Sequence, residues 1–261
     1  MEVYLRLGVF AGVFFCVAAA EYLWPRRKQL MTRWRRWPHH LGLALLNLLL
    51  VRALIPISLT GFAFAMTQQG VGILPLLDLP LFVTVILSVM LLDLVIYAQH
   101  VMFHHVPILW RLHCVHHADT EIDVTTALRF HPVEIFISFG IKLAAIAAIG
   151  APPEAVLLFE IILNGCAMFN HGNLRLPLGL DRVMRAIIVT PDMHRVHHST
   201  RKEETNSNYG FNLALWDRLF RTYRAQPALG HENMTIGLEE FRALEEARLA
   251  RLLTQPFRRS S

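Results

Sequence analysis

The sequence predicts an all-α integral membrane protein with about four to five transmembrane or re-entrant helices and a cytoplasmic histidine-rich helical cap. Two observations lead to this class. The 261 residues are 54% apolar and only 17% charged, with a mean hydropathy of +0.40, and the apolar residues gather in blocks. The pattern His-x-x-His-His also occurs twice, at residues 113–117 and 194–198. Composition alone would produce this pattern roughly 0.04 times, so two copies indicate a site.

The charge pattern favours a membrane over nucleic acid as the partner. The formal net charge is +5, with a pI near 9.4, and the cations lie in short runs beside apolar blocks. This is typical of the cytoplasmic face of a membrane protein, so we expect no nucleic-acid binding. The 3 cysteines are scattered and form neither a disulfide framework nor a Cys-x-x-Cys pair. Any metal must therefore be held by other ligands.

Three apolar blocks precede the first histidine cluster. Residues 4–24 resemble an uncleaved anchor with its N-terminus outside, because the arginine-rich loop follows the block instead of preceding it. The second block, residues 41–66, should kink or end its helix near Pro56. The third, residues 73–97, has Pro75 and Pro80 near its start and returns to the cytoplasm.

Two shorter blocks, residues 133–150 and 154–170, are separated by the sequence Ala-Pro-Pro. Both are near the lower length limit for a span, and a tight hairpin would return His171 to the side of His100. After Asn173 the chain should be soluble or interfacial, with an aromatic helix over 212–223. A cytoplasmic helix over 237–253 should follow, with Leu238, Phe241 and Leu244 on one stripe. We interpret residues 1–261 as one domain, with an anchor (1–72), a catalytic core (73–224) and a helical tail (225–261).

The histidine spacing predicts a metal site. Histidines at positions i, i+3 and i+4 share one face of a helix, and neutral imidazole suits iron, zinc, copper and nickel. The chain contains neither the Glu-x-x-His pair of carboxylate-bridged bundles nor the His-Glu-x-x-His motif of zinc proteases. We interpret His39, His40, His105 and His231 as structural. The ten candidate ligands, enough for two ions with four or five each, are His100, His104, His113, His116, His117, His131, His171, His194, His197 and His198.

The stretches "HVMFH", "LWRLHCVHHADTEIDVTTALRFHPVE", "NHGN" and "TPDMHRVHHSTRKEETNSNYGFNLALWDRLFRTY" resemble the fatty acid hydroxylase / sterol desaturase superfamily, in its bacterial sterol desaturase branch. The resemblance covers residues 90–224. It implies two iron ions held by the eight clustered histidines, with His131 and His171 as additions. It also implies dioxygen as co-substrate and hydroxylation or desaturation of a fatty acyl, sterol-like or ether lipid. Arg221 departs from the family pattern, because it occupies a position that is usually glycine.

The bacterial branch of the resemblance implies an inner-membrane enzyme, and the positive-inside rule, together with the returning hairpin, predicts a metal site on the cytoplasmic side. We find no fused cytochrome b5 or ferredoxin segment, so a separate protein of that kind should donate electrons. Zinc binds such ligands tightly and is expected as a substitute metal. The sequence does not indicate an oligomeric state, and it does not identify the lipid or the carbon attacked.

Acidic and amide side chains near the histidines are candidates to orient the ligands: Asp93, Asp119, Asp123 and Asp192, with Glu134 and Asn170. Asp93 lies seven residues before His100 in an apolar block, where a carboxylate is costly unless it is paired. A hydrogen bond to a neighbouring helix is the alternative reading. The basic residues Arg111, Arg129, Arg195 and Arg201 could bind lipid headgroups or an acidic electron donor, although the positive-inside bias explains them equally well.

Two other classes of function stay open at this point. One is a non-enzymatic membrane protein that binds or transports a metal or haem, and the other is a zinc-dependent membrane hydrolase. A transporter would need polar residues deep in several spans. Here the histidines lie instead at the ends of apolar blocks.

Overall fold

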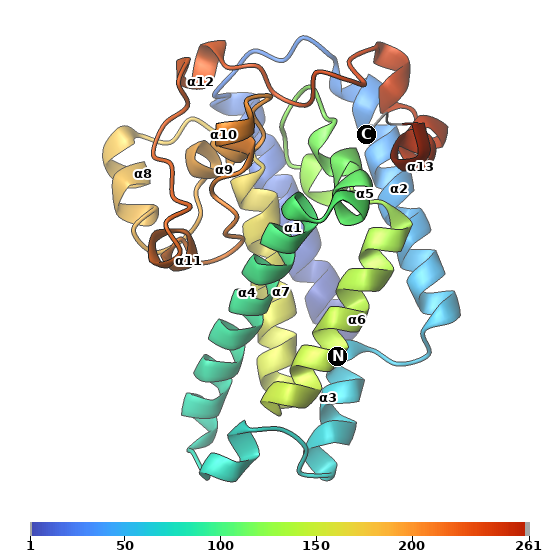
Figure 1. The fold of residues 1–261 in the computed structure, drawn as a ribbon, viewed down its shortest axis with the longest axis vertical. Helices are drawn as coiled ribbons and strands as arrows, with labels where there is room; N and C mark the ends of the chain where they lie inside the picture. The colour runs from blue at the N-terminus through green and yellow to red at the C-terminus, as the bar shows by residue number, and fades with distance from the viewer. Residues whose placement is uncertain (1, 259–261) are drawn as a thin grey trace.

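Five segments of the chain are long and apolar enough to cross a membrane, in agreement with the prediction. They are α1 (Glu2–Leu23), the segment Arg33–Gln68, α4 (Leu81–His105), α6 (Pro132–Ile149) and α7 (Pro153–Asn170). The computed structural model describes residues 2–258, and this part of the chain holds helices and no named β-strand. The long helices form a bundle with short helices gathered at one end (Figure 1). This confirms the all-α membrane class.

The second span is broken where the sequence predicts it. α2 (Arg33–Leu54) ends before Pro56, which lacks a backbone N–H and cannot continue the hydrogen-bond ladder. α3 (Leu59–Gln68) then begins with Ser58 as its N-cap, whose hydroxyl accepts a hydrogen bond from the Gly61 N–H. A 3-10 turn, η1 (Leu74–Leu77), leads into α4.

The predicted hairpin is formed by α6 and α7. Pro132 and Pro153 occupy first-turn positions, where their missing N–H costs no helical hydrogen bond. Gly150 ends α6 in the left-handed conformation, with φ 73°. The hairpin therefore returns His171 to the end of the bundle that carries His100. We call this end the histidine end, and the other the loop end.

At the loop end, the hairpin tip is fastened to the loop that follows α3. The Ile73 N–H donates to the Ala148 carbonyl at 3.1 Å. A Cβ atom on Gly72 would lie 2.2 Å from the Gly150 backbone, so the two chains meet without side chains between them. Figure 1 shows these loops together at the lower end of the bundle.

The histidine end is covered by short helices. In chain order these short helices are α5 (Pro107–His117), η2 (Thr126–Leu128), α8 (Leu178–Met184), α9 (Pro191–His197), α10 (Lys202–Thr205), α11 (Leu215–Leu219), α12 (Gly230–Asn233), η3 (Leu244–Ala247) and α13 (Leu249–Arg258). α13 packs on α5 and α2 through Leu252, Leu43 and Val115.

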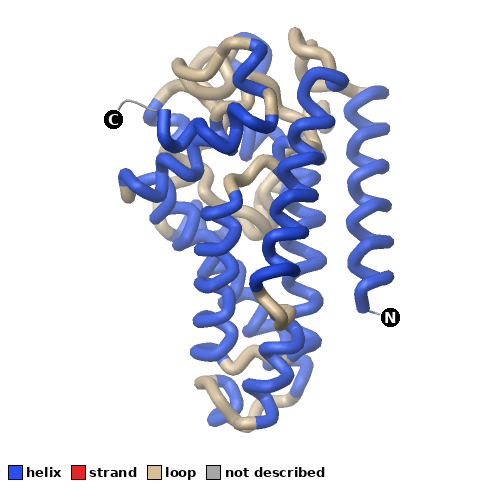
Figure 2. The backbone as a smooth tube through the Cα atoms, turned by 90° about the vertical axis from the view of Figure 1, so that its right-hand side faces the viewer, coloured by secondary structure: helices blue, strands red, loops and turns tan. Residues whose placement is uncertain are grey.

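α1 stands at the side of the bundle (Figure 2). It packs on α7 along its length. It meets α2 at the histidine end, where the Phe14 ring lies 5.6 Å from Trp37 and Arg33 pairs with Glu21 at 3.1 Å.

The prediction of one helix over 237–253 is wrong. Residues 237–243 wrap around the cap, and the helix begins only at Leu249. Gly237 and Phe241 both have positive φ angles, which a helix does not allow. The Arg242 guanidinium also donates to the carbonyls of Ile236 and Leu238 and holds this bend. Leu244 is 50% exposed, so the predicted apolar stripe does not form.

The helix predicted over 212–223 is much shorter than expected, because α11 ends at Leu219. Arg221 adopts the left-handed conformation, with φ 61°. Glycine takes this conformation without cost, whereas a residue with a Cβ atom such as arginine rarely adopts it.

Candidate metal centre

Nine of the ten predicted histidines converge at the histidine end. They come from α4, α5, the residue after α7, and α9 with its C-cap. Within each of two groups the potential ligand atoms lie within 4.8 Å of one another. The first group is His100, His104, His113, His117 and His197, and the second is His116, His171, His194 and His198.

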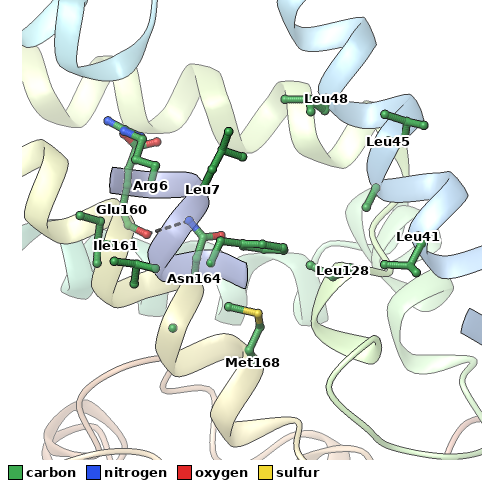
Figure 3. A pocket seen from close by; sticks show the side chains of 14 residues that line it. Arg6, Leu7, Leu41, Leu45, Leu48, Leu128, Glu160, Ile161, Asn164 and Met168 are labelled. Atoms are coloured by element: carbon green, nitrogen blue, oxygen red, sulfur yellow. Dashed lines mark hydrogen bonds and ion pairs between the residues drawn. The ribbon is translucent and has the colours of Figure 1, made fainter. Parts of the chain in front are cut away.

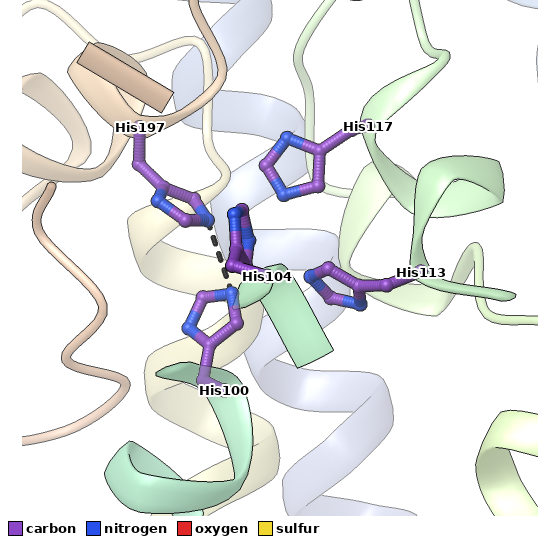
Figure 4. A group of neighbouring side chains, drawn as sticks. All are labelled: His100, His104, His113, His117 and His197. Atoms are coloured by element: carbon purple, nitrogen blue, oxygen red, sulfur yellow. Dashed lines mark hydrogen bonds between the residues drawn. The ribbon is translucent and has the colours of Figure 1, made fainter. Parts of the chain in front are cut away.

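The first group has nitrogen atoms that point toward a common centre (Figure 4). His100 and His197 lie closest, with their Nε2 atoms 3.0 Å apart. The Nδ1 of His100 donates to the Tyr209 carbonyl at 2.7 Å, and that of His197 donates to the Ser207 carbonyl at 2.8 Å. Because a neutral imidazole carries one N–H, both Nε2 atoms then present lone pairs to each other.

Two facing lone pairs repel unless a cation lies between them. Adjacent nitrogen ligands bound at about 2.1 Å to one metal, at right angles, are about 3 Å apart. The spacing of the His100 and His197 nitrogens therefore fits a shared metal ion.

The second group shows the same crowding. His171 Nε2 lies 3.1 Å from His116 Nε2 and 3.0 Å from His194 Nε2. His171 Nδ1 donates to the Ala167 carbonyl at 2.7 Å, so one lone pair at Nε2 faces two neighbours. Among the described residues, His117 and His198 have no hydrogen-bond partner at either buried ring nitrogen. Such orphaned polar atoms need an explanation, and a metal ion supplies one.

The burial of the histidines keeps them in the form that binds metal. Burial lowers the pKa of His113 to about 3 and is the main cause that lowers the pKa of His171 to about 4. Burial, reinforced by neighbouring imidazoles, likewise holds the pKa values of His117 and His198 well below the ordinary value. Neutral imidazole is the ligand form, so the site needs no proton removal at pH 7.

Glu134 is the acidic candidate that contacts one of the nine converging histidines. Its carboxylate accepts a hydrogen bond from His113 Nδ1 at 2.7 Å, and both side chains are buried. This fixes the tautomer of His113 and leaves a lone pair on its Nε2, which could bind a metal ion. His104 is oriented more loosely, through Asn206 at 3.4 Å.

The other acidic candidates make no hydrogen bond to the nine converging histidines among the described residues. Asp119 and Asp123 bind the buried Arg36 guanidinium of α2, each at 2.8 Å in its closest contact. Burial would raise the pKa of Asp119, but Arg36 and other nearby cations lower it below its ordinary value. These contacts hold the loop after α5 against α2.

Asp93 and Asp192 also have other partners. Asp93 accepts from the Trp216 indole at 2.8 Å and from the Leu213 N–H at 3.1 Å, which is the alternative that the sequence left open. Asp192 pairs with Arg195 and Arg26. The amide of Asn170 donates to the Phe211 carbonyl at 2.9 Å. Within the described residues, none of the four aspartates is hydrogen bonded to any of the nine histidines.

His131 lies outside both groups. It is the N-cap of α6, where its Nδ1 accepts from the Val133 N–H at 3.3 Å, while Nε2 donates to the Leu253 carbonyl at 3.3 Å. Arg129 and Arg195 are 1% and 0% exposed, so the suggestion that they meet headgroups or a donor at the surface is wrong. Sequence reasoning also missed Tyr209 and Ser207. They act through backbone carbonyls, which leave no signal in side-chain patterns.

Two hollows adjoin the histidines from opposite sides. A cavity of about 240 Å³ within the bundle is lined by His100 and His113, together with mostly apolar residues such as Phe103 and Phe211. A polar groove of about 760 Å³ on the cap reaches His104 and Trp110. The centre is thus reached through an apolar route and a polar one.

The fold and the site together define a membrane protein with a histidine-rich centre at one end of its helices. The chain belongs to the fatty acid hydroxylase family, whose model matches residues 85–222. This range includes all nine converging histidines.

Several curated proteins resemble the chain. Ornithine lipid hydroxylase OlsE of Rhizobium tropici is 30% identical over 149 residues, which are 57% of this chain and 44% of the relative. Human alkylglycerol monooxygenase is 30% identical over 54% of this chain and 30% of its own length. Fatty acid hydroxylase vlmA of a Lecanicillium species is 27% identical over 61% of this chain and 47% of its own length. The match spans less than half of each relative. No solved structure matches the chain significantly.

Proposed function

We propose that this protein is an oxygen-dependent di-iron enzyme that hydroxylates or desaturates a C–H bond of a membrane lipid. The two groups of five and four histidine nitrogens carry this proposal. The similarity to an ornithine lipid hydroxylase and an alkylglycerol monooxygenase supports a lipid as substrate and hydroxylation as the outcome. Dioxygen is the proposed co-substrate.

One iron would be held by the group of five histidines and the other by the group of four. When bound, the two irons supply the oxidising power that side-chain acid–base chemistry lacks for an unactivated C–H bond. The chain itself supplies neutral nitrogen ligands at fixed positions. His100 and His197 are oriented by backbone carbonyls, and His113 is oriented by Glu134.

The cavity inside the bundle would hold the lipid segment to be oxidised. His100 and His113 form part of its wall, while Phe103, Phe130 and Phe211 keep that wall largely apolar. These rings exclude water from the space beside the ligands. A lipid can reach this space from the membrane without leaving an apolar environment.

We place the histidine end on the cytoplasmic side of a bacterial inner membrane. The arginine-rich segment between α1 and α2 lies at this end, which supports the placement through the positive-inside rule. The groove beside His104 and Trp110 is the proposed approach for an external electron donor of the cytochrome b5 or ferredoxin kind.

The test is lipid analysis of cells with and without the protein, grown under ¹⁸O-labelled dioxygen. Hydroxylation predicts a lipid that gains one labelled oxygen, and desaturation predicts the loss of two hydrogens. His113→Ala should abolish the product, while His39→Ala, which changes a histidine outside the centre, should retain it. Iron-loaded, reduced protein that changes no lipid would leave a metal-binding or zinc-hydrolase function.

A further inference from the structure

The cavity beside the ligands continues toward the membrane. This inner cavity shares Ala44, Leu128 and Asn164 with an outer cavity of about 360 Å³ between α1, α2 and α7. Leu41, Leu45 and Leu48 of α2 line the outer cavity and are 41%, 56% and 49% exposed (Figure 3). These leucines would face lipid chains, so the outer cavity suits an acyl or alkyl chain.

Both ionic groups of the outer cavity are already paired. The Arg6 guanidinium binds the Glu160 carboxylate at 2.5 Å, bridging α1 and α7. Figure 3 shows this pair together at one edge of the cavity, with Ile161 and Asn164 nearby. The outer cavity therefore has no unpaired charge to offer a ligand.

The inner cavity differs from the outer one, because a row of polar side chains on α6 lines one of its walls. Glu134, Ser138 and Lys142 line it at four-residue intervals on α6, and therefore lie on one face of that helix. Glu134 binds the ligand His113. Lys142 lies about 12 Å farther along the helix, toward the middle of the membrane segment.

Lys142 is a cation without a close acid. Within the described residues, no carboxylate oxygen lies within 4.0 Å of its ammonium group. Glu160 acts on it electrostatically but is committed to Arg6. A lysine in a membrane segment is costly unless it faces a cavity and meets a partner, so such a residue points to function.

α2 and α4 each contribute a hydrogen-bond acceptor to the inner cavity. Asn47 Oδ1 and Gln99 Oε1 are buried without a partner among the described residues, and both side chains line the inner cavity. The Asn47 amide is oriented, because its Nδ2 donates to the Phe130 carbonyl at 2.8 Å. A ligand in this space would satisfy them with N–H or O–H groups.

We propose that the inner cavity binds the polar end of an acidic lipid. Lys142 pairs with a carboxylate or phosphate of the lipid, while Asn47 and Gln99 accept hydrogen bonds from its N–H or O–H groups. The hydrocarbon chain lies in the outer cavity. This assignment rests on the proposed function in taking the inner cavity as the substrate site. The C–H bond beside His100 and His113 then belongs to the polar end of the lipid and not to the tip of its chain.

The test measures lipid binding to the full-length protein in neutral detergent, without iron or dioxygen. The probes are an N-acyl amino acid, a phosphatidic acid and an uncharged monoalkylglycerol of equal chain length. Wild-type protein should bind at least one acidic lipid ten-fold or more tighter than the monoalkylglycerol. The acidic lipid that binds tighter identifies carboxylate or phosphate as the ligand group.

Three variants test whether Lys142 causes the preference for an acidic lipid over the monoalkylglycerol. Lys142→Met should remove it and leave monoalkylglycerol binding within two-fold of wild type, which also shows that the variant is folded. Lys142→Arg, which keeps the charge, should retain the preference, and so should Lys28→Met at an exposed lysine outside the cavities. Equal wild-type binding of acidic and neutral lipids, or an unchanged preference in Lys142→Met, would overturn the assignment.

The two proposals can fail separately. A protein that binds acidic lipids through Lys142 but incorporates no labelled oxygen keeps this assignment and loses the proposed oxygenase activity. A protein that oxidises only uncharged lipids keeps that activity and loses this assignment.

Discussion

At the start of α6, two neighbouring side chains have different roles. His131 caps the helix and bonds to the backbone of α13, whereas Glu134, one turn later, bonds to the ring of His113. Sequence spacing could not distinguish their roles, because both residues follow the His-x-x-His-His pattern at 113–117 and both are titratable. Their roles differ because the first turn of α6 directs His131 toward α13 and Glu134 toward His113.

We expect Glu134→Gln to weaken iron binding by about 10- to 100-fold, because an oriented and more basic His113 depends on this carboxylate. Competition with a coloured chelator measures the affinity. Glu154→Gln, at an exposed acid in the first turn of α7, is the matched control and should leave the affinity unchanged. Equal effects of both substitutions would contradict the role of Glu134.

His131→Ala and His116→Ala should have different effects. Loss of His116 removes a ligand from the four-histidine group, so iron content should fall from two ions per chain toward one. Loss of His131 should retain both ions and reduce stability by about 1 kcal/mol, the usual cost of losing an N-cap. Elemental analysis and thermal unfolding of both variants check this. Iron lost equally from both would restore His131 as a ligand.

The histidine spacing predicted most of the candidate centre, because residues at i, i+3 and i+4 must share a helix face. His171 was predictable for another reason, since a short hairpin has to return to the side it came from. The carbonyls of Tyr209 and Ser207 were not predictable. Every residue has a carbonyl, and its direction is fixed only when the chain between α9 and α11 folds over the site.

At the scale of elements, apolar length predicted the membrane helices and proline predicted the break in the second span. The surface helices were harder, because their ends depend on local backbone geometry. Arg221 and Phe241 both have positive φ angles, although neither is glycine. Apolar periodicity gives no warning of such residues, so both predicted helices extended through positions that cannot be helical.

α13 provides a test at this scale, since it packs on α5, the helix that carries His113, His116 and His117. Leu252 is fully buried against Leu43 and Val115, so Leu252→Ala should destabilise the protein by about 2–5 kcal/mol. Phe257 is in the same helix but 71% exposed, and Phe257→Ala should change stability little. Thermal unfolding in detergent measures both. A small effect at Leu252 would show that α13 adds little to the cap.

At the scale of the whole molecule, metal binding should stabilise the fold. The nine buried histidines bring their lone pairs close together. An ion that binds only the folded chain raises the temperature at which the chain unfolds. Iron-loaded protein should therefore melt at a higher temperature than chelator-treated protein. The double variant His113→Ala/His116→Ala should show a much smaller difference. An equal melting temperature with and without iron would argue against a shared centre.

Orientation in the membrane is a second property of the whole molecule. In a chain whose three cysteines are replaced by alanine, Gln69→Cys at the loop end should react with an impermeant maleimide on intact cells after outer-membrane permeabilisation. Lys202→Cys at the histidine end should react only after lysis of the inner membrane. The opposite result would place the histidine end outside.

The contact between Gly72 and Gly150 joins the loop after α3 to the α6–α7 hairpin at the loop end. α4 follows directly from that loop. The helices α3, α4, α6 and α7 are therefore joined to one another at the loop end. α1 lies outside this fastening, at the side of the bundle (Figure 2), and its N-terminal part is held by Arg6, which bonds to Glu160 of α7 and Thr60 of α3. Movement of α1 away from α2 would therefore break the Arg6 contacts, but it would leave the contact between Gly72 and Gly150 at the loop end intact.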